Sequence, residues 1–487
     1  MTKKPLSRRE FLKLTGIAAA GGILAACTSP TAAPPPAEPT KAPAGAEPEP
    51  TKAPAPAAQA AEISFMGWGA IEEDEAVRSA IDAFKSVEPN IKVNWMHTPD
   101  SYNEKLLSLV AAKTPPDTAF VAAGDFRTFS KEGLLVDITD LVKGDPIIGA
   151  KDYFIQPQEE RRCTWQGKWY GIGSCWVADH LYYNADVFKT AGIEPPSNDP
   201  EKAWDWTTFL DVARKLTIDK NGKHPDESGF DRGNIERFGC DVSNYRLHHA
   251  SFVQSNGGSY FDPETGLLGL DKPEAVSAMQ ELADLSLKYN VAPFAGTAEQ
   301  AGMSALGMDA SQMLEAGKLA MLVDGSWSVA ALHKITPTLG TAVLPKMKTP
   351  ATGMNAHLHG VLKGTKNTDA SFKWVRYLAT EFYQLIFLKI GLWLPSQTAL
   401  MTPDGMKKWY SERKSGTEGI HPPGYDVLIT KYVPKYGFPF YEPPGWPDAR
   451  AILFPEVEAI YNGNKTAEEV MTVVVPKCND ILKKAAL

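Results

Sequence analysis

The chain is poor in cysteine and lacks the short motifs of several enzyme classes. Its 487 residues include five cysteines, none in a C-x-x-C pair, which argues against a zinc ribbon or a thioredoxin-type site. The sequence contains no G-x-S-x-G, no H-E-x-x-H and no phosphate-binding loop. No basic run follows the first dozen residues, and the net charge is -8, so we expect no nucleic-acid partner. We expect neither a cofactor nor a metal ion.

Tryptophan, by contrast, is abundant. Hydrophobic residues make up 43% of the chain and charged residues 22%, as in ordinary soluble proteins, and the length allows two or more domains. The 12 tryptophans are about twice the number expected for a chain of this length, and a core seldom needs so many. The composition therefore predicts that some tryptophans line a surface or a cleft.

The first residues indicate export and lipidation. "SRREFLK" carries twin arginines, Arg8 and Arg9, and the apolar stretch 14–26 after it is too short to span a bilayer. The pattern resembles a twin-arginine signal peptide, which we assign to residues 1–26. The stretch ends in "LAAC", which resembles a bacterial lipobox with Cys27 as the lipidated first residue of the mature protein. Two or three acyl chains there would anchor the chain stably, whereas an ordinary free cysteine is the alternative.

Residues 27–61 are expected to be the lipidated cysteine and a disordered linker. Positions 28–61 contain 10 prolines and 12 alanines, and the heptapeptide EPTKAPA occurs twice. Such a composition cannot bury a core, and the segment would reach roughly 100 Å if extended at about 3.1 Å per residue. We expect it to tether a folded part to the outer face of the bacterial cytoplasmic membrane, at the cell surface or in the periplasm.

Four further cysteines lie in the folded part, namely Cys163, Cys175, Cys240 and Cys478. Cys163 and Cys175 are the local candidates for a disulfide. Unpaired buried thiols are the alternative, because a twin-arginine substrate folds in a reducing compartment before export. The sequence leaves both possibilities open.

From Glu62 onward, strand and helix patterns alternate. Strand patterns at 63–65, 91–95 and 117–123 are separated by helical patterns that end near Val87 and Ala112. This alternation predicts a mostly parallel, three-layer α/β domain. A second α/β pattern occupies about 177–350. Helical patterns follow at 367–390 and 448–485, and the proline- and aromatic-rich stretch 432–446 between them is expected to be a long loop.

Flat aromatic rings and carboxylates follow several predicted strands. In "AMLVDGSW", an apolar run stops at Asp324, and Trp327 comes directly after the turn. Trp68, Asp125 and Trp176 follow other strands in the same way, beside glycines. Open α/β sheets bind ligands beyond the carboxyl ends of their strands, so this recurrence favours Trp327 as a ligand platform over a packing residue.

Longer motifs carry a family resemblance. "KWYGIGSCWVADHLYYNADVFKTAGIEPP" (168–196), "AGKLAMLVDGSW" (316–327), "SNGGSYFD" (255–262) and "GLWLPSQTAL" (391–400) resemble, in their order, the motifs of family 1 extracellular solute-binding proteins. The resemblance covers about 62–487. It implies a two-lobe periplasmic-binding-protein fold, type II-like, with a ligand cleft between the lobes. It also implies a receptor that delivers a carbohydrate to the permease of an ABC importer, acting as a monomer and not as an enzyme.

The resemblance also implies domain limits. The first lobe would span 62–176 and the second 177–350. The chain would return to the first lobe at 351–395, and C-terminal helices at 396–487 would pack on the second lobe.

Eight side chains are expected to bind the ligand. Trp327 matches the stacking tryptophan after the family's Gly-x-Trp turn. His357 stands where the family favours paired glycines, which is a departure from its pattern. Glu442 and Trp446 are weaker candidates in the aromatic stretch. The eight are Trp68, Asp125, Trp176, Tyr245, Asp324, Trp327, His357 and Trp393.

Other readings compete with sugar binding. His357 and His359 could bind a metal, but no acid or cysteine stands nearby at ligand spacing, so we expect polar residues at the rim of a cleft. The stretch 217–230 superficially resembles a calcium loop but lacks acidic residues at its first and last positions, so we expect a hairpin turn. A surface-anchored glycosidase using Asp125 and Asp324 remains an alternative, as does a receptor for a polyamine, a peptide or a ferric complex.

Overall fold

The computed structural model describes residues 60–294, 308–414 and 418–486. The predicted signal peptide, Cys27 and nearly all of the predicted linker lie outside the described residues. Two groups of elements, called here the first and second lobes, have separate apolar cores.

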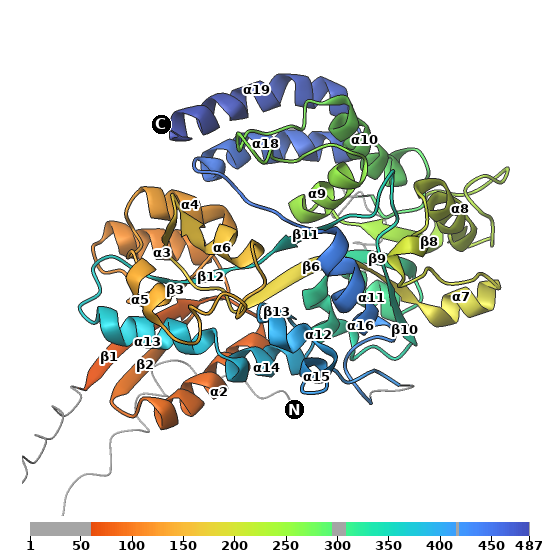
Figure 1. The fold of residues 1–487 in the computed structure, drawn as a ribbon. Coiled ribbons are helices and arrows are strands. Elements are labelled where there is room, and N and C mark those ends of the chain that lie inside the picture. Colours follow the sequence, from red (N-terminus) through yellow and green to blue (C-terminus); the bar gives the residue numbers. More distant parts are fainter. Residues whose placement is uncertain (1–59, 295–307, 415–417, 487) are drawn as a thin grey trace, which may run out of the picture. The chain divides into compact units, whose positions relative to one another are not determined.

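The first lobe is built on a four-stranded sheet in the order β12-β3-β1-β2. Strand β1 runs parallel to both β2 and β3, and β12 closes the edge antiparallel to β3. Helices α2 and α13 lie on one side of this sheet, and α3 and α4 lie on the other (Figure 1). The elements are β1 (Ala61–Gly67), α2 (Ile71–Val87), β2 (Ile91–His97), α3 (Tyr102–Ala111), β3 (Thr118–Val121), α4 (Ala123–Lys131), α5 (Thr139–Gly144), α6 (Gln158–Cys163), β4 (Thr164–Trp165), β5 (Lys168–Trp169), β12 (Leu358–Val361), α13 (Thr368–Leu378) and α14 (Glu381–Lys389).

The second lobe is built around the long strand β6 (Cys175–Asn184) in a sheet of order β14-β11-β6-β9-β8-β7. Strands β10 and β13 also pair with β6. The strands are β7 (Ile218–Asp219), β8 (Ile235–Val242), β9 (Leu319–Gly325), β10 (Leu339–Ala342), β11 (Thr352–Asn355), β13 (Leu394–Pro395) and β14 (Gly437–Pro439).

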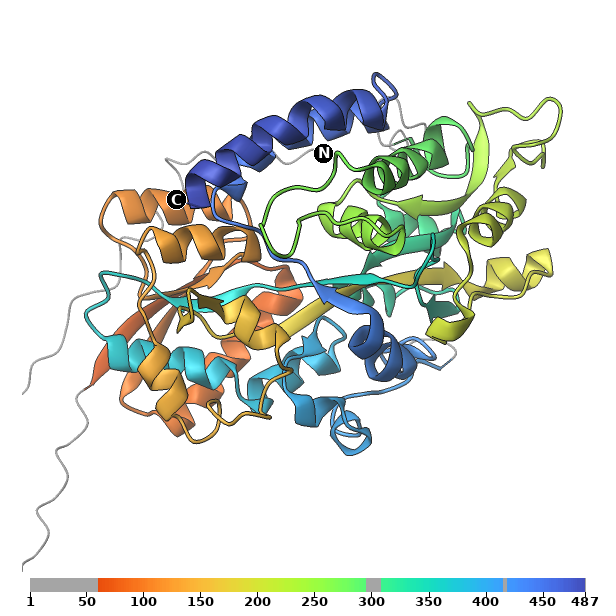
Figure 2. The ribbon, with the colours of Figure 1, turned by 45° about the horizontal axis from the view of Figure 1, so that its top comes forward.

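The helices of this lobe cover its sheet and extend to the end of the described chain. They are α7 (Ala185–Ala191), α8 (Trp206–Leu216), α9 (Arg246–Ser255), α10 (Pro273–Leu287), α11 (Ala310–Glu315), α12 (Val329–Leu332), α15 (Pro403–Met406), α16 (Tyr425–Val427), α17 (Val433–Tyr436), α18 (Trp446–Tyr461) and α19 (Ala467–Ala486). Helices α18 and α19 pack side by side (Figure 1), and α19 lies in front in the turned view (Figure 2). No helix among the described residues is long and apolar enough to cross a membrane.

Local sequence explains where many of these helices begin. Asn184 caps α7 by accepting hydrogen bonds from two backbone amides, and Asp205 caps α8 by accepting one from Thr208. The first turn of α2 is acidic, which suits the positive end of a helix dipole. Its apolar positions, such as Val77 and Phe84, are buried against the sheet as their helical spacing predicts.

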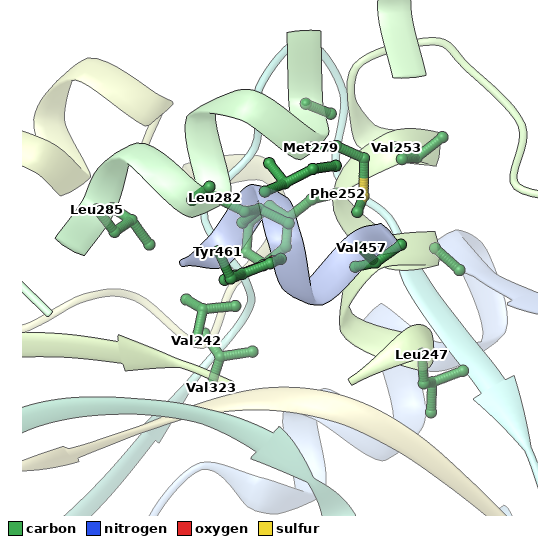
Figure 3. Close-up of a cluster of buried hydrophobic side chains, with 14 of the residues drawn as sticks. Val242, Leu247, Phe252, Val253, Met279, Leu282, Leu285, Val323, Val457 and Tyr461 are labelled. Carbon is green, nitrogen blue, oxygen red and sulfur yellow. The ribbon is translucent and has the colours of Figure 1, made fainter. Parts of the chain in front are cut away.

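The second lobe's apolar core joins distant parts of the chain. Val457 and Tyr461 of α18 lie among Met279 and Leu282 of α10 and side chains of α9 (Figure 3). The C-terminal helices therefore share one core with the middle of the chain. The predicted lobe limits stay a prediction.

Three expectations about elements need correction. The strand predicted over 117–123 ends at Val121, because α4 already begins at Ala123. The helical patterns at 367–390 and 448–485 each form two helices. The loop predicted over 432–446 is wrong, since this stretch holds α17, β14 and the start of α18. Proline at the edge strand β14 and in the first turn of α17 is compatible with both structures.

Candidate functional site

Trp327 and Tyr245 form an aromatic pair at the ends of β9 and α9. Their ring centroids lie 5.9 Å apart at 84°, edge to face, and both side chains are partly exposed. Trp327 sits in the short helical turn after β9, and Tyr245 stands immediately before α9. The Trp327 ring lies over Gly325, where any side chain would collide with it. The glycine that the sequence places in this turn thus lets the ring fold over the end of the strand.

Asp324 holds this turn in place through two hydrogen bonds. One carboxylate oxygen accepts a hydrogen bond from the amide of Gly325 at 2.7 Å, and the other accepts one from the hydroxyl of Ser328 at 2.5 Å. Burial raises the pKa of Asp324, and the nearby His248 opposes this shift. A ligand would therefore meet a carboxylate whose geometry the turn already fixes.

Asp125 lies in the first turn of α4, directly after β3. Its side chain is buried, with a hydrogen bond to Asn103 of α3. Burial raises its pKa, Arg450 of α18 opposes the shift, and Glu442 adds to it. Asp125 thus follows a strand as the sequence predicts, and it lies in the first turn of a helix.

An ion pair links the neighbourhood of Asp125 to that of Tyr245. Nε of Arg246 lies 2.7 Å from Oε1 of Glu442, and Glu442 is fully buried. The Arg246 guanidinium also lies over the Tyr245 ring, 5.2 Å from its centroid. Glu442 packs against Gly124 of α4 so closely that a Cβ there would lie 2.8 Å from Oε2. These contacts form a continuous path from Trp327 through Tyr245 and Arg246 to α4 of the first lobe.

Trp68, His357 and Trp393 gather in the first lobe. His357 lies edge-on to Trp68 at 5.3 Å and to Trp393 at 5.1 Å, and it stacks on Phe120 at 4.2 Å. His357 and Trp393 are both buried, and Trp393 stacks on Phe387 at 3.7 Å. Burial lowers the pKa of His357 to about 3, so the ring is neutral.

Trp68 is the partly exposed member of this group. It lines an open hollow of about 620 Å³ together with Tyr102 and Asn103. Asn103 is also the hydrogen-bond partner of Asp125. The amide side chain that bonds Asp125 therefore lines the same hollow as Trp68.

Trp176 is fully buried, with the guanidinium of Arg162 over its ring at 4.0 Å. Together with Asn355 and Glu442, both residues line a cavity of about 10 Å³, roughly the space of one water. The ring nitrogen of Trp176 and Oε2 of Glu442 have no hydrogen-bond partner among the described residues.

The eight predicted residues therefore fall into neighbouring groups. Tyr245, Asp324 and Trp327 lie together, as do Trp68, His357 and Trp393. Trp176 lines the cavity beside Glu442, and Asp125 follows Gly124, the residue against which Glu442 packs. Their roles stay predictions. Asn103, Arg246 and His248 occupy ordinary helical positions, so no motif in the sequence identifies them as site residues. The repeated polar residues of "NYRLHH" are a signal for Arg246 and His248 only.

The described residues hold neither a metal-binding cluster nor a disulfide. Among the described residues, no group of three or more His, Cys, Asp or Glu side chains could hold a metal ion. Asp219 in the calcium-like stretch instead accepts backbone hydrogen bonds from Asn221, Lys223 and Asp231. Residues 218–219 pair antiparallel with β8, so this stretch turns back as a hairpin, as predicted. All four described cysteines are free and buried.

The chain is similar in sequence to bacterial proteins that bind solutes outside the cytoplasm and to curated sugar-binding proteins. A sequence profile described as "Bacterial extracellular solute-binding protein" matches residues 68–384. The maltotriose-binding protein of Pyrococcus abyssi is 22% identical over 329 residues, 66% of this chain and 63% of that protein. The arabinooligosaccharide-binding protein of Bacillus subtilis is 27% identical over 244 residues, 48% of this chain. The chain spans 63% and 49% of the lengths of these two curated relatives.

Solved structures agree with the fold. An ABC substrate-binding protein from Listeria monocytogenes in complex with cycloalternan matches with a TM-score of 0.73 at 20% identity, over 87% of this chain and 99% of that chain. A maltose-bound protein of T. maritima matches with a TM-score of 0.68 at 19% identity, over 87% and 100%. The predicted two-lobe binding-protein fold is thereby confirmed.

Proposed function

Because the chain belongs to the bacterial extracellular solute-binding protein family, we propose that it is a receptor for a carbohydrate. It takes the sugar up between its two lobes and delivers it to the permease of an ABC importer. It acts as a monomer and binds its ligand without chemical change.

The observation that carries this proposal is the Trp327–Tyr245 pair beside carboxylates. A sugar ring has an apolar C–H face and a rim of hydroxyl groups. Partly exposed aromatic rings offer rigid apolar area to the face, and carboxylates accept strong hydrogen bonds from the hydroxyls. Micromolar affinity needs about -8 kcal/mol, which a few stacked rings and several hydrogen bonds supply.

An oligosaccharide fits better than a monosaccharide. Trp68, with its open hollow, and the Trp327–Tyr245 pair are two separate, partly exposed aromatic positions. Two relatives carry names that specify maltotriose and arabino-oligosaccharides. A ligand of several sugar units could contact both positions at once.

Calorimetric titration of the full-length protein tests this function. The panel contains maltose, maltotriose, arabinotriose, glucose and arabinose, with glycerol 3-phosphate, spermidine and a tripeptide as non-sugar controls. Saturable binding that tightens from mono- to trisaccharide supports the proposal. Binding of a control alone would assign another solute class. Shortened sugars on chromatography after incubation would identify a glycosidase.

The receptor is exported through its twin-arginine signal and anchored through acylated Cys27. The support is the sequence alone, in particular Arg8 and Arg9 before a short apolar stretch that ends in "LAAC". Replacing Cys27 by Ser should move the protein from the membrane to the soluble fraction. Replacing both arginines by Lys should leave it in the cytoplasm. Unchanged fractionation in either variant contradicts the corresponding signal.

A further inference from the structure

His248 is buried next to the Tyr245 ring, close to two carboxylates. Its Nδ1 is 3.0 Å from Oδ1 of Asp179 on β6, and its Nε2 is 3.9 Å from Oδ1 of Asp324 at the end of β9. His248 and Asp179 are both within 1% of complete burial. Asp179 is held in place by Ser251, whose hydroxyl donates a hydrogen bond to it at 2.6 Å. A neutral imidazole would leave two carboxylates near one another with little compensation.

The charged surroundings of His248 are mostly acidic. Asp241 on β8 is a third carboxyl group in the set, and burial raises its pKa to about 6 while His248 opposes the shift. On α9 itself, His249 is neutral because burial lowers its pKa to about 3, and Arg246 is engaged by Glu442. The titratable or charged groups around His248 are Asp179, Asp241, Asp324, Tyr245, Arg246 and His249.

His248 lies against Tyr245 and near Asp324, the residue that holds the turn carrying Trp327. Its ring lies edge-on to Tyr245, with centroids 5.2 Å apart. On its other side, Asp324 bonds the amide of Gly325 and the hydroxyl of Ser328, and so fixes the turn that carries Trp327. A change in the charge of His248 therefore acts directly on Tyr245, and on Trp327 through Asp324.

We propose that His248, as an imidazolium ion, is a positioning residue that holds Tyr245 and the Trp327 turn in their binding arrangement. Ligand affinity consequently falls when His248 loses its proton. This inference rests on the proposed sugar-binding function, but the positioning itself can be measured without a ligand.

The sign of the pH effect follows from the carboxylates. Burial lowers the pKa of His248, but the charges of Asp179 and Asp324 outweigh burial and raise it above the ordinary value. The charged form is thus favoured in the folded state. The stabilisation that the imidazolium ion provides is complete below about pH 6.5, the ordinary pKa of histidine. It disappears as the pH rises through the higher pKa that His248 has in the folded protein.

The first test measures affinity against pH for wild type and His248→Gln, using the tightest-binding sugar of the panel above. We expect the wild-type Kd to rise about tenfold between pH 6 and pH 9, within the usual range of coupling between two sites. His248→Gln should bind more weakly at pH 6 and show no such rise. A merely structural histidine would instead give equal losses at every pH, which overturns the proposal.

The second test needs no ligand. Trp327 fluorescence, taken as the difference between wild type and Trp327→Phe, is followed against pH beside the His248 ring resonance in ¹³C-histidine NMR spectra. Coincident titrations support positioning even if no sugar binds, in which case only the proposed function fails. A fluorescence signal that is flat while His248 titrates overturns the inference.

A further variant covers the case in which His248→Gln does not fold. Asp324→Asn removes one stabilising charge and should move both the NMR and fluorescence titrations to lower pH together. His249→Gln, one residue along the same helix and neutral throughout, is the matched control and should leave both midpoints unchanged. Unmoved midpoints in Asp324→Asn contradict the proposed link.

Discussion

Glu442 and Arg246, 196 residues apart in sequence, form an ion pair at 2.7 Å beside the aromatic pair. Glu442 comes from the segment before α18 and packs against Gly124 of the first lobe, whereas Arg246 opens α9 of the second. Burial opposes the charge on Arg246, but Glu442 and Tyr245 outweigh it and raise the pKa of the guanidinium. The pair therefore couples Tyr245 to the first lobe.

Replacing Arg246 by Met should destabilise the protein and weaken sugar binding. Glu442 is buried, so losing its partner leaves an uncompensated charge, at a cost of about 3–5 kcal/mol. Chemical denaturation gives the stability, and calorimetry gives the affinity. Lys407→Met, which breaks the exposed pair with Asp404, is the control and should cost less than about 1 kcal/mol. Equal small effects for both variants would refute a structural role for the buried pair.

Gly124→Ala should weaken binding through Glu442. The new methyl group would lie 2.8 Å from Oε2 of Glu442 and would displace it from Arg246, with a stability loss of about 1–3 kcal/mol. Gly144→Ala in α5 meets no neighbouring atom within 4 Å and should be neutral or slightly stabilising. Thermal unfolding and calorimetry of the two variants provide the comparison. If Gly124→Ala shows the same stability and affinity as Gly144→Ala, then the packing of Glu442 on α4 contributes to neither stability nor sugar binding.

Glu73→Gln should change how stability depends on pH. Burial in the first turn of α2 raises the pKa of Glu73 to about 8. Because the pKa of Glu73 is higher in the folded than in the unfolded protein, its contribution to the free energy of unfolding is complete below about pH 4.3. This contribution is lost as the pH rises through about 8. The variant should therefore be more stable than wild type at pH 9, by a few kcal/mol at about 1.4 kcal/mol per pKa unit.

Denaturation midpoints between pH 5 and pH 9 measure this effect. Glu75→Gln, at an exposed position of the same helix, should give a curve parallel to that of wild type. A Glu73→Gln curve parallel to wild type would mean that Glu73 is already ionised at neutral pH in the folded protein.

Periodic patterns predicted much of the fold. The strand patterns at 63–65 and 91–95 lie within β1 and β2, and the helical pattern that ends near Val87 matches the end of α2, because apolar spacing records which face is buried. The stretch 432–446 was predicted wrongly because proline and aromatic content suggested a loop. Within this stretch, Phe438 of β14 instead forms a strand pair with Gly353 of β11, which the local sequence pattern does not predict.

The candidate site could be predicted only in part. Trp327 stands at the end of a strand as "LVDGSW" indicates, with its ring partly exposed. The same rule selected Trp176 wrongly, because Trp176 is the second residue of β6 and does not follow a strand, and its ring is fully buried under Arg162. A rule based on strand ends also contains no information on burial. Partners such as Arg246 and Glu442 meet only through the tertiary fold.

The central claim is that Trp327 is a binding surface for a sugar, and one comparison tests it most directly. Full-length wild type, Trp327→Ala and Trp409→Phe are titrated calorimetrically with maltotriose and with the tightest-binding sugar of the panel. Trp409 is buried in another part of the second lobe, with its ring nitrogen bonded to the carbonyl of Leu400, and serves as the control. We predict that Trp327→Ala loses at least about tenfold in affinity, or about 1.4 kcal/mol, and keeps its fold, whereas Trp409→Phe binds as wild type does. Wild-type sugar affinity in a folded Trp327→Ala protein would contradict the account.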